Sequence, residues 1–570
     1  MKRRYLFLVF VCGLLSLPSV LRAQTNLLDN SFGTKGTVMT AISGGNGSDD
    51  EANAIAIQPD GKIVLVGKSE DASNHYAFAL ARYNTDGSFD NTFGTNGTVR
   101  TPFLEGGIDD EAICVVLQSD GKIVVAGFSE DGSSNYAFAI ARYDTDGTLD
   151  NSFGSGGEVR TQIVGGNGKH DLSFDVVIQP NGKIIVAGLS TATTGVAIAL
   201  VRYNSDGTLD ANFGSDGTVR TPVRYFDHAS YVRIEPNSEI TVGGIGVDYQ
   251  FSESSYTWSW PNYGDVFEVI KYNSDGTIDN SFGTNGIVRD TVESIADSPY
   301  WNPSLWSVVA QPDGKFMGIG YSNGGSQYIA TNPSTHQFLI SRFDTAGIPD
   351  LTFGLNGVSV AAVKGGTGND YGHAAVVQSD GKIVVVGPSD YSSSLSKFAL
   401  ARFNSDGSVD STFGIKGSYT NSVNGGAGND EASCAAVQSD GKIVLAGRAE
   451  TGSGGWAFAL ARYLGTATAI QKGDNPVPKN YLLSQNYPNP FNPTTTIRFD
   501  LKTNSTVRFS IFNVLGQRVQ EFDLGRLGAG SYSQTVDMSR FASGVYFYRL
   551  EAMASDGERF AEMKKMVLIK

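Results

Sequence analysis

Seven copies of a unit of about 60 residues fill most of this chain, and a long fixed period constrains a fold more than any local pattern. The clearest marker is D-x-x-F-G-x-x-G, whose copies are separated by 61, 60, 60, 69, 71 and 60 residues. Its phenylalanines are Phe32, Phe93, Phe153, Phe213, Phe282, Phe353 and Phe413. A second marker, Q-[PS]-[DN]-G-K, starts at Gln58, Gln118, Gln179, Gln311, Gln378 and Gln438, with a degenerate copy at Glu235. The basic residue of a third marker is Arg82, Arg142, Arg202, Lys271, Arg342, Arg402 and Arg462.

The first full copy shows what one unit forms. Two apolar runs, residues 52–58 and 62–67, flank a Pro-Asp-Gly turn and predict a β-hairpin. Residues 76–83 alternate large and small side chains, which suits a strand stacked between neighbouring sheets. Residues 98–101 predict a fourth strand after the D-x-x-F-G loop. The period of two excludes a helical solenoid, and four short antiparallel strands per copy are typical of a propeller blade.

The phase of the copies predicts how the array ends. The first copy begins at Leu28 with the loop and a fourth strand, residues 37–40, before any first, second or third strand. The last copy stops at Tyr463, after a third strand with no fourth strand behind it. If the N-terminal strand completes the last blade, no sheet edge is left unmatched. We therefore predict an all-β fold: a seven-bladed β-propeller of four-stranded antiparallel blades, closed by the N-terminal strand.

These motifs resemble the delta-60 repeat family of bacterial β-propellers over about residues 28–463. The resemblance implies the fold and no established biochemical activity. From the extent of the repeats and this resemblance, we expect the propeller to span residues 24–464 and a linker to span residues 465–479.

The N-terminus predicts export. Residues 2–4 are basic, an apolar run follows to about Val20, and Ala23 precedes Gln24, as in a secretory signal peptide spanning residues 1–23. The apolar run is short for a spanning helix, and no other stretch approaches the ~20 residues that a bilayer needs, so we predict no transmembrane anchor. The net charge of −15 argues against nucleic acid as a partner.

Residues 480–570 predict a second, smaller β-sandwich. They contain Y-P-N-P-F-N-P at 487–493, I-F-N-V-L-G at 511–516, S-G-V-Y at 543–546 and a basic, apolar end at 564–570. These elements resemble the type A C-terminal sorting domain of the type IX secretion system. The resemblance implies that the secretion machinery is a partner and that the protein reaches the outer cell surface or the medium.

An Asp lies eight residues before most second markers: Asp50, Asp110, Asp171, Asp227, Asp370 and Asp430, with Pro303 in the remaining copy. One interpretation is a ring of carboxylates at a channel mouth that concentrates cations. The alternative is that each Asp caps a turn by accepting backbone N–H groups, and recurrence in copy after copy favours it.

The turn [DN]-[ST]-D-G-x-x-D, complete at residues 144–150, resembles the start of a Ca²⁺ loop. The distal acidic ligand of an EF-hand loop is missing, and one copy has Ala346-Gly347 in place of Asp-Gly. We expect hairpin turns with an Asp that pairs the neighbouring Arg, and we predict no cofactor, with Ca²⁺ as the open alternative.

The two long copies carry four of the five Trp in the chain. The candidate binding residues there are Tyr256, Trp258, Trp260, Tyr300, Trp301 and Trp306. Aromatics on long loops suit stacking on sugar rings or packing against a protein. The alternative is that they bury one another in a local cap.

Catalytic patterns find little support, since the five His are scattered without metal-ligand spacing. We therefore expect a monomeric, noncatalytic, secreted or cell-surface scaffold that binds a glycan or a protein. The alternative function is a polysaccharide hydrolase or lyase at the channel mouth, with Asp227 beside His228 as acid and base.

Overall fold

The computed structural model describes residues 27–42, 49–103, 109–164, 170–192, 195–222, 228–247, 250–252, 257–259, 265–291, 303–323, 335–363, 368–390, 395–426, 428–465, 471–472, 478, 480–492, 494–527, 529–538, 541–554 and 558–569. Every helix-or-strand element within these ranges is a β-strand, which confirms the predicted all-β class. The predicted signal peptide, residues 1–23, lies outside them.

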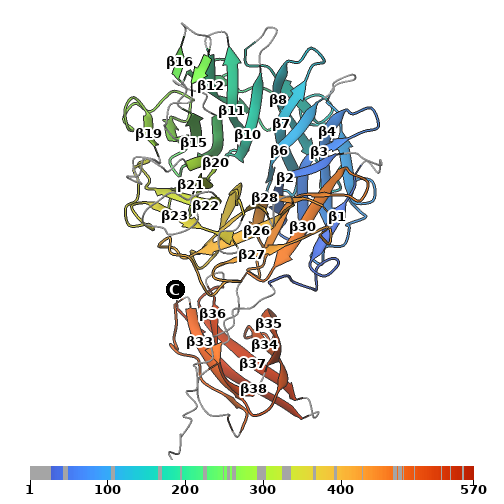
Figure 1. Cartoon of the computed structure of the whole chain (residues 1–570), viewed down its shortest axis with the longest axis vertical. Coiled ribbons are helices and arrows are strands. Elements are labelled where there is room, and N and C mark those ends of the chain that lie inside the picture. Colours follow the sequence, from blue (N-terminus) through green and yellow to red (C-terminus); the bar gives the residue numbers. More distant parts are fainter. Residues whose placement is uncertain are drawn as a thin grey trace, which may run out of the picture.

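Seven four-stranded antiparallel sheets, numbered I to VII, occupy residues 37–463 (Figure 1). Sheet I has β2 (Asp50–Ile57), β3 (Ile63–Glu70), β4 (Tyr76–Tyr83) and β5 (Thr98–Thr101). Sheet II has β6 (Asp110–Leu117), β7 (Ile123–Glu130), β8 (Tyr136–Tyr143) and β9 (Glu158–Thr161). Sheet III has β10 (Asp171–Ile178), β11 (Ile184–Ala192), β12 (Gly195–Tyr203) and β13 (Thr218–Pro222). The predicted four-stranded antiparallel unit is confirmed.

The remaining sheets repeat this order. Sheet IV has β14 (His228–Ile234), β15 (Ile240–Val247), β18 (Asp265–Tyr272) and β19 (Ile287–Thr291). The small hairpin β16 (Gln250–Ser252) and β17 (Thr257–Ser259) lies between β15 and β18. Sheet V has β20 (Pro303–Ala310), β21 (Phe316–Asn323), β22 (His336–Phe343) and β23 (Val358–Ala361). Sheet VI has β24 (Ala374–Val377), β25 (Ile383–Asp390), β26 (Ser396–Phe403) and β27 (Ser418–Asn421).

Sheet VII joins the two ends of the repeat region. It consists of β28 (Asp430–Val437), β29 (Ile443–Glu450), β30 (Trp456–Tyr463) and β1 (Thr37–Thr40). Strand β1 is antiparallel to β30, with Thr37 opposite Ala461 and Thr40 opposite Phe458. The fourth strand of the last sheet thus comes from the start of the repeats.

The first strands of neighbouring sheets lie side by side. Strand β2 contacts β6, β6 contacts β10, and the succession runs through β14, β20, β24 and β28 back to β2. Because each sheet is an antiparallel meander, its connections fall at two ends. The turn end carries the Q-x-x-G-K turns and the D-x-x-F-G loops. The loop end carries the connections between second and third strands and those that lead to the next first strand.

Large side chains of one sheet pack against small ones of the next. Phe78 and Leu80 of sheet I share a buried cluster with Ala139 and Ala141 of sheet II. The third strand therefore buries both of its faces, and residues 77–83 are all buried. This is the stacking that the alternation of large and small residues predicts.

Two further sheets form the C-terminal part (Figure 1). One has the order β31 (Gln471–Lys472), β36 (Gly530–Asp537), β33 (Thr494–Leu501) and β32 (Leu482–Leu483). The other has the order β35 (Arg518–Leu527), β34 (Ser505–Phe512), β37 (Gly544–Ala554) and β38 (Arg559–Leu568). Both contribute to one buried cluster that includes Phe499, Phe509 and Tyr548.

Candidate binding site at the loop end of the sheets

The recurring Arg, Asp, Lys and Phe of the repeat converge at the turn end. In sheet I, Arg82 Nε donates to Asp90 Oδ2 at 2.8 Å, and the guanidinium lies 4.4 Å from the Phe93 ring centroid. Lys62 reaches the same carboxylate at 3.1 Å. Arg82 Nη1 also donates to the Thr145 carbonyl, which follows the third strand of sheet II. This group, which we call the clamp, ties each sheet to the next.

The clamp recurs in most sheets. Its other Arg–Asp pairs are Arg142–Asp150, Arg202–Asp210, Arg342–Asp350, Arg402–Asp410 and Arg462–Asp29. Burial alone would raise the pKa of Asp410, but hydrogen bonds from Lys382 and Thr412 and the charge of Arg402 outweigh it and lower the pKa to about 2. In sheet IV, Lys271 replaces the Arg and lies 4.8 Å from the Phe282 ring centroid. Because the same contacts recur from sheet to sheet, we assign these side chains a structural role in the scaffold.

The clamp of sheet VII joins distant parts of the chain. Arg462 pairs with Asp29, which precedes β1, at 2.9 Å, and its Nη1 donates to the Thr85 carbonyl of sheet I. The Tyr83 hydroxyl of sheet I donates to Thr40 Oγ1 in β1 at 2.8 Å. Sheet I is therefore held to sheet VII by the same contacts that hold other neighbouring sheets.

The Asp residues of the predicted acidic ring lie at the start of the first strands, at the loop end. Those within the described ranges are fully buried: Asp50, Asp110, Asp171, Asp370 and Asp430. Asp50 Oδ2 accepts the Ile42 amide and Asp370 Oδ2 accepts the Val363 amide, both at 2.7 Å. Burial raises the pKa of Asp370 to about 7. Buried carboxylates that bond the preceding connection have the geometry of caps, and Asp227 lies outside the described residues.

The candidate Ca²⁺ turns hold their carboxylates close to their own backbone. Asp146 accepts the amide of Thr148 at 3.0 Å and its hydroxyl at 2.7 Å, and Asp150 pairs with Arg142 at 2.7 Å. Within the described ranges, no group of three or more His, Cys, Asp or Glu could hold a metal ion. The absence of a cofactor stays a prediction, with Ca²⁺ as its alternative.

A β-bulge re-aims one side chain of the first strand near the loop end. The register shift falls at Asn53, Ile113, Phe174, Ser230, Trp306 and Ser433. A Cβ added to Gly67, opposite the bulge in sheet I, would lie 1.8 Å from the Glu51 carbonyl oxygen, so the bulge requires glycine there. Asn53 Nδ2 donates to Glu111 Oε1 and to the Ala112 carbonyl of sheet II, both at 2.9 Å. The bulge residue thus points toward the next sheet.

Trp306 occupies the bulge of sheet V and keeps 51% of its surface exposed. Its ring stacks on His373 of sheet VI, with 4.9 Å between centroids and 22° between planes. Burial lowers the pKa of His373 to about 4, so the imidazole is neutral at physiological pH, and it hydrogen-bonds the backbone of Ala432 in sheet VII. The indole thus has one supported ring system and an exposed apolar surface, which is the geometry that stacking on a ligand requires.

Further aromatic side chains line the same region of sheets V and VI. The Tyr321 and His336 rings are 4.7 Å apart, and each lies 5.0 Å from the Tyr371 ring. The hairpin of β16 and β17 and the connection from β19 to β20 also belong to the loop end, because they follow a second and a fourth strand. The two long insertions therefore leave the sheets at the end where Trp306 lies.

Sheets VII, I and II carry charges at the corresponding positions. Lys68 lies 3.0 Å from Glu111 and 3.8 Å from Glu51. Arg448 lies 3.1 Å from Glu51 and 2.6 Å from Glu431. These ion pairs form one chain across three sheets, with Glu51 in the middle. Burial raises the pKa of Glu51 against the opposing effects of Arg448 and Lys68.

The structure describes only part of the aromatic set that the sequence proposed. Tyr256, Trp260, Tyr300 and Trp301 lie outside the described residues, and Trp258 lies on β17. Trp306 is on the innermost strand of sheet V and not in an insertion. The sequence reasoning missed His373 and Tyr371, which stand in sheet VI where sheet I has Asn53 and Glu51. Aligning the copies at the bulge would have found them.

Comparison with known proteins identifies both parts of the chain. The family described as a domain of unknown function (DUF5122) beta-propeller matches residues 58–93, 118–153, 179–213, 255–282, 378–413 and 438–465. A secretion system C-terminal sorting domain matches residues 485–567. The repeat region is therefore similar to DUF5122 β-propeller repeats, and the C-terminal part is similar to a type IX sorting domain. The sorting domain marks the protein for type IX export to the cell surface or beyond.

Other comparisons are less informative. No curated protein matches this chain in sequence. The extracellular domain of a putative hybrid two-component system from B. thetaiotaomicron is 10% identical, with 91% of this chain and 78% of that one covered and a TM-score of 0.16. The extracellular domain of a putative one-component system from the same organism is 10% identical, with 93% and 98% covered and a TM-score of 0.15. Among the described residues, no helix is long and apolar enough to cross a membrane.

Proposed function

We propose that the seven sheets form a seven-bladed β-propeller closed by the N-terminal strand, and that this ring is a monomeric, noncatalytic scaffold that binds a glycan or a protein at the cell surface. The pairing of β1 with β30, the contact of β28 with β2 and the clamp of Arg462 support the ring. Type IX export places such a scaffold where extracellular ligands occur.

The half-exposed indole of Trp306 carries the binding proposal. The exposed part of this aromatic ring contributes little to the fold, whereas it offers an apolar surface to the C–H face of a sugar or to a protein side chain. His373 holds the indole from behind, so the platform is rigid before a ligand arrives. The neutral imidazole adds hydrogen-bonding capacity without charge.

A glycan array and a panel of surface polysaccharides test the proposal with the purified protein. Trp306→Ala should weaken binding of any hit at least tenfold, since truncating a hot-spot Trp costs about 2 kcal/mol or more. Phe89→Ala, which removes an aromatic ring that is 37% exposed at the turn end, is the matched control and should leave binding unchanged. Binding that Trp306→Ala leaves intact would refute this site.

Two measurements address the other parts of the proposal. The same polysaccharides should show no turnover, and turnover that Asp227→Asn removes would favour the hydrolase or lyase alternative. Sedimentation of the full chain should give a monomer at all concentrations.

A further inference from the structure

A separate apolar surface lies at the turn end of sheets V and VI. It consists of exposed side chains from the loops between third and fourth strands: Ile348 (57% exposed), Leu351 (68%), Leu355 (49%), Val409 (36%) and Ile415 (53%). We call it the turn-end patch. It holds five of the nine exposed large apolar side chains among the described residues of the repeat region. Such clustering on a soluble protein marks an interaction surface.

The other copies of the repeat are an internal control for this patch. At the position of Ile348 they carry Ser88, Thr148, Thr208, Thr277 and Ser408, and the first copy has a buried Leu27. At the position of Leu351 they carry Asn30, Asn91, Asn151, Ala211, Asn280 and Ser411. At the position of Leu355 they carry Thr34, Thr95, Ser155, Ser215 and Thr284, and the remaining copy has Ile415, which belongs to the patch. The loop therefore folds with polar residues at the positions of Ile348, Leu351 and Leu355, whereas the position of Val409 is apolar in the other copies too. Their presence here has to be explained by something outside the fold.

The loop of sheet V keeps its usual framework under these changes. Asp344 Oδ1 accepts the Ile348 amide at 2.9 Å, and Asp350 pairs with Arg342 at 2.9 Å and with Lys315 at 2.7 Å. The clamp is thus intact, and the aliphatic side chains are additions to its surface.

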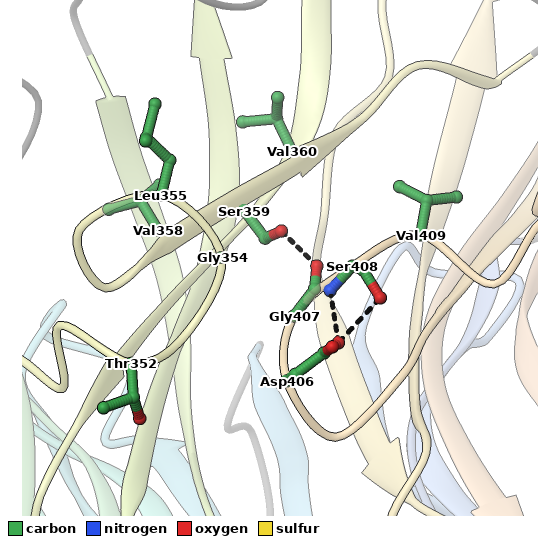
Figure 2. A pocket seen from close by; sticks show the side chains of 10 residues that line it. All are labelled: Thr352, Gly354, Leu355, Val358, Ser359, Val360, Asp406, Gly407, Ser408 and Val409. Atoms are coloured by element: carbon green, nitrogen blue, oxygen red, sulfur yellow. Dashed lines mark hydrogen bonds between the residues drawn. The ribbon is translucent and has the colours of Figure 1, made fainter.

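A pocket of about 360 Å³ opens within the patch (Figure 2). Leu355 and Val358 line it from sheet V, and Val409 lines it from sheet VI. The Gly354 amide donates to the Asp406 carbonyl at 2.7 Å, which fixes the two walls relative to each other. The Asp406 carboxylate is exposed at the pocket, where it accepts only from Ser408 among the bonds drawn in Figure 2. The pocket is therefore preformed, partly apolar and acidic on one side.

We propose that the turn-end patch docks an extended segment of a partner protein that carries aliphatic side chains next to a basic residue. Asp344 and Asp406 flank the patch, against Lys416 as the one basic residue of loops 344–360 and 404–417. This charge balance favours a cation on the partner. A net charge of −15 opposes both a second copy of this chain and an anionic lipid surface. Aliphatic side chains also lack the flat rings on which sugars stack, so the patch differs in kind from the Trp306 platform.

The test uses substitutions that the chain itself supplies. Ile348→Thr, Leu351→Asn, Leu355→Thr and Ile415→Thr together restore residues found in other copies, so the melting temperature should not change. A phage-displayed library of random peptides is panned against the full chain, and synthetic versions of the enriched peptides are titrated by calorimetry. Aliphatic peptides with Lys or Arg should be enriched and should bind the fourfold variant at least tenfold more weakly. Asp406→Asn should weaken them severalfold and reduce their salt dependence.

Controls separate this surface from the other site. Thr148→Ser, Asn151→Ser and Ser155→Thr, at the same positions in another copy, should leave peptide affinity unchanged, as should Trp306→Ala. The proposal is overturned if no such peptide is enriched, or if the enriched peptides bind the fourfold variant equally well. A wild-type dimer that the fourfold variant abolishes would assign the patch to a second copy instead.

Discussion

Two sides of the repeat region use equivalent positions at the loop end in opposite ways. On the side of sheets VII, I and II, Glu51, Lys68 and Arg448 belong to a chain of ion pairs. On the side of sheets V and VI, Tyr371 stands where Glu51 stands, and Tyr321 stands where Lys68 stands. The charged side satisfies its own groups, whereas the aromatic side leaves the Trp306 ring half exposed.

The two sides can differ at the loop end because the Arg–Asp clamps at the turn end are the same on both sides. Arg142 and Arg342 make the same clamp, with Asp150 in sheet II and Asp350 in sheet V. Each clamp bonds a carbonyl of the next sheet, so the stacking does not depend on which side chains stand at the loop end. The clamps thus join neighbouring sheets at the turn end, whereas the side chains that differ between these two sides stand at the loop end.

Breaking a clamp should have the largest effect. Arg462→Met leaves the buried Asp29 with Lys442 as its remaining ion-pair partner among the described residues, and loss of one partner from a buried pair costs about 3–5 kcal/mol. Arg142→Met removes the equivalent clamp of sheet II, whose fourth strand β9 follows the third strand β8 along the chain. Urea unfolding should show Arg462→Met as the more destabilised, because only non-covalent contacts hold β1 in sheet VII. If both variants lose the same free energy of unfolding, the clamp of sheet VII is no more important for stability than the clamp of sheet II.

Much of this scaffold could be predicted from the sequence, because the period, the Pro-Asp-Gly turns and the alternation in residues 76–83 each act locally. The bulge could not, since it depends on the pairing of Asn53 with a neighbouring strand and on the close approach at Gly67. The stacking of Trp306 on His373 joins residues 67 positions apart in two sheets, and no local pattern announces it. The aromatic residues proposed from the sequence therefore included Trp306 but not His373 or Tyr371, and a binding role for them stays a prediction.

The buried caps Asp370 of sheet VI and Asp430 of sheet VII should affect the pH dependence of the free energy of unfolding to different extents. Burial raises the pKa of Asp370 to about 7, and Asp390 adds to the rise, whereas Lys397 opposes the rise at Asp430. Because folded Asp370 holds its proton more tightly than the unfolded chain, its contribution to stability is largest near pH 4 and falls as the pH rises to about 7. Asp370→Asn should flatten this decline by on the order of 1–3 kcal/mol.

The measurement is urea unfolding at intervals from pH 4.5 to pH 7.5. Asp430→Asn is the matched variant and should change the slope less, although both variants lose the same kind of cap. A slope that is the same for wild type and Asp370→Asn would show that Asp370 stays charged in the fold.

Neutralising Glu51, the middle residue of the chain of ion pairs, should lower the free energy of unfolding by a smaller amount. Glu51→Gln leaves Lys68 with Glu111 and Arg448 with Glu431, and all of these groups are partly exposed. Exposed pairs contribute about 0.2–1 kcal/mol, and the loss should shrink further as NaCl is raised. Glu111→Gln should cost more, because it leaves Lys68 only the longer contact with Glu51. A loss for Glu51→Gln that is insensitive to salt would point to packing instead of charge.

The smallest effect on stability should come from a substitution that gives the aromatic side a residue type found at the equivalent position of the charged side. His373→Asn places in sheet VI the residue that sheet I uses at its bulge, where Asn53 bonds the Ala112 carbonyl of the next sheet. An Asn at 373 can make the same kind of bond to Ala432, so the free energy of unfolding should change by less than about 0.5 kcal/mol. The ring beneath Trp306 is lost, however, and affinity for a stacking ligand should fall severalfold because the indole is no longer held.

Since the pKa of His373 is about 4, binding to the wild type should also stay constant between pH 6 and pH 8. Affinity that drops toward pH 6, or that survives His373→Asn undiminished, would mean that the imidazole does not support the platform as its stacking geometry indicates.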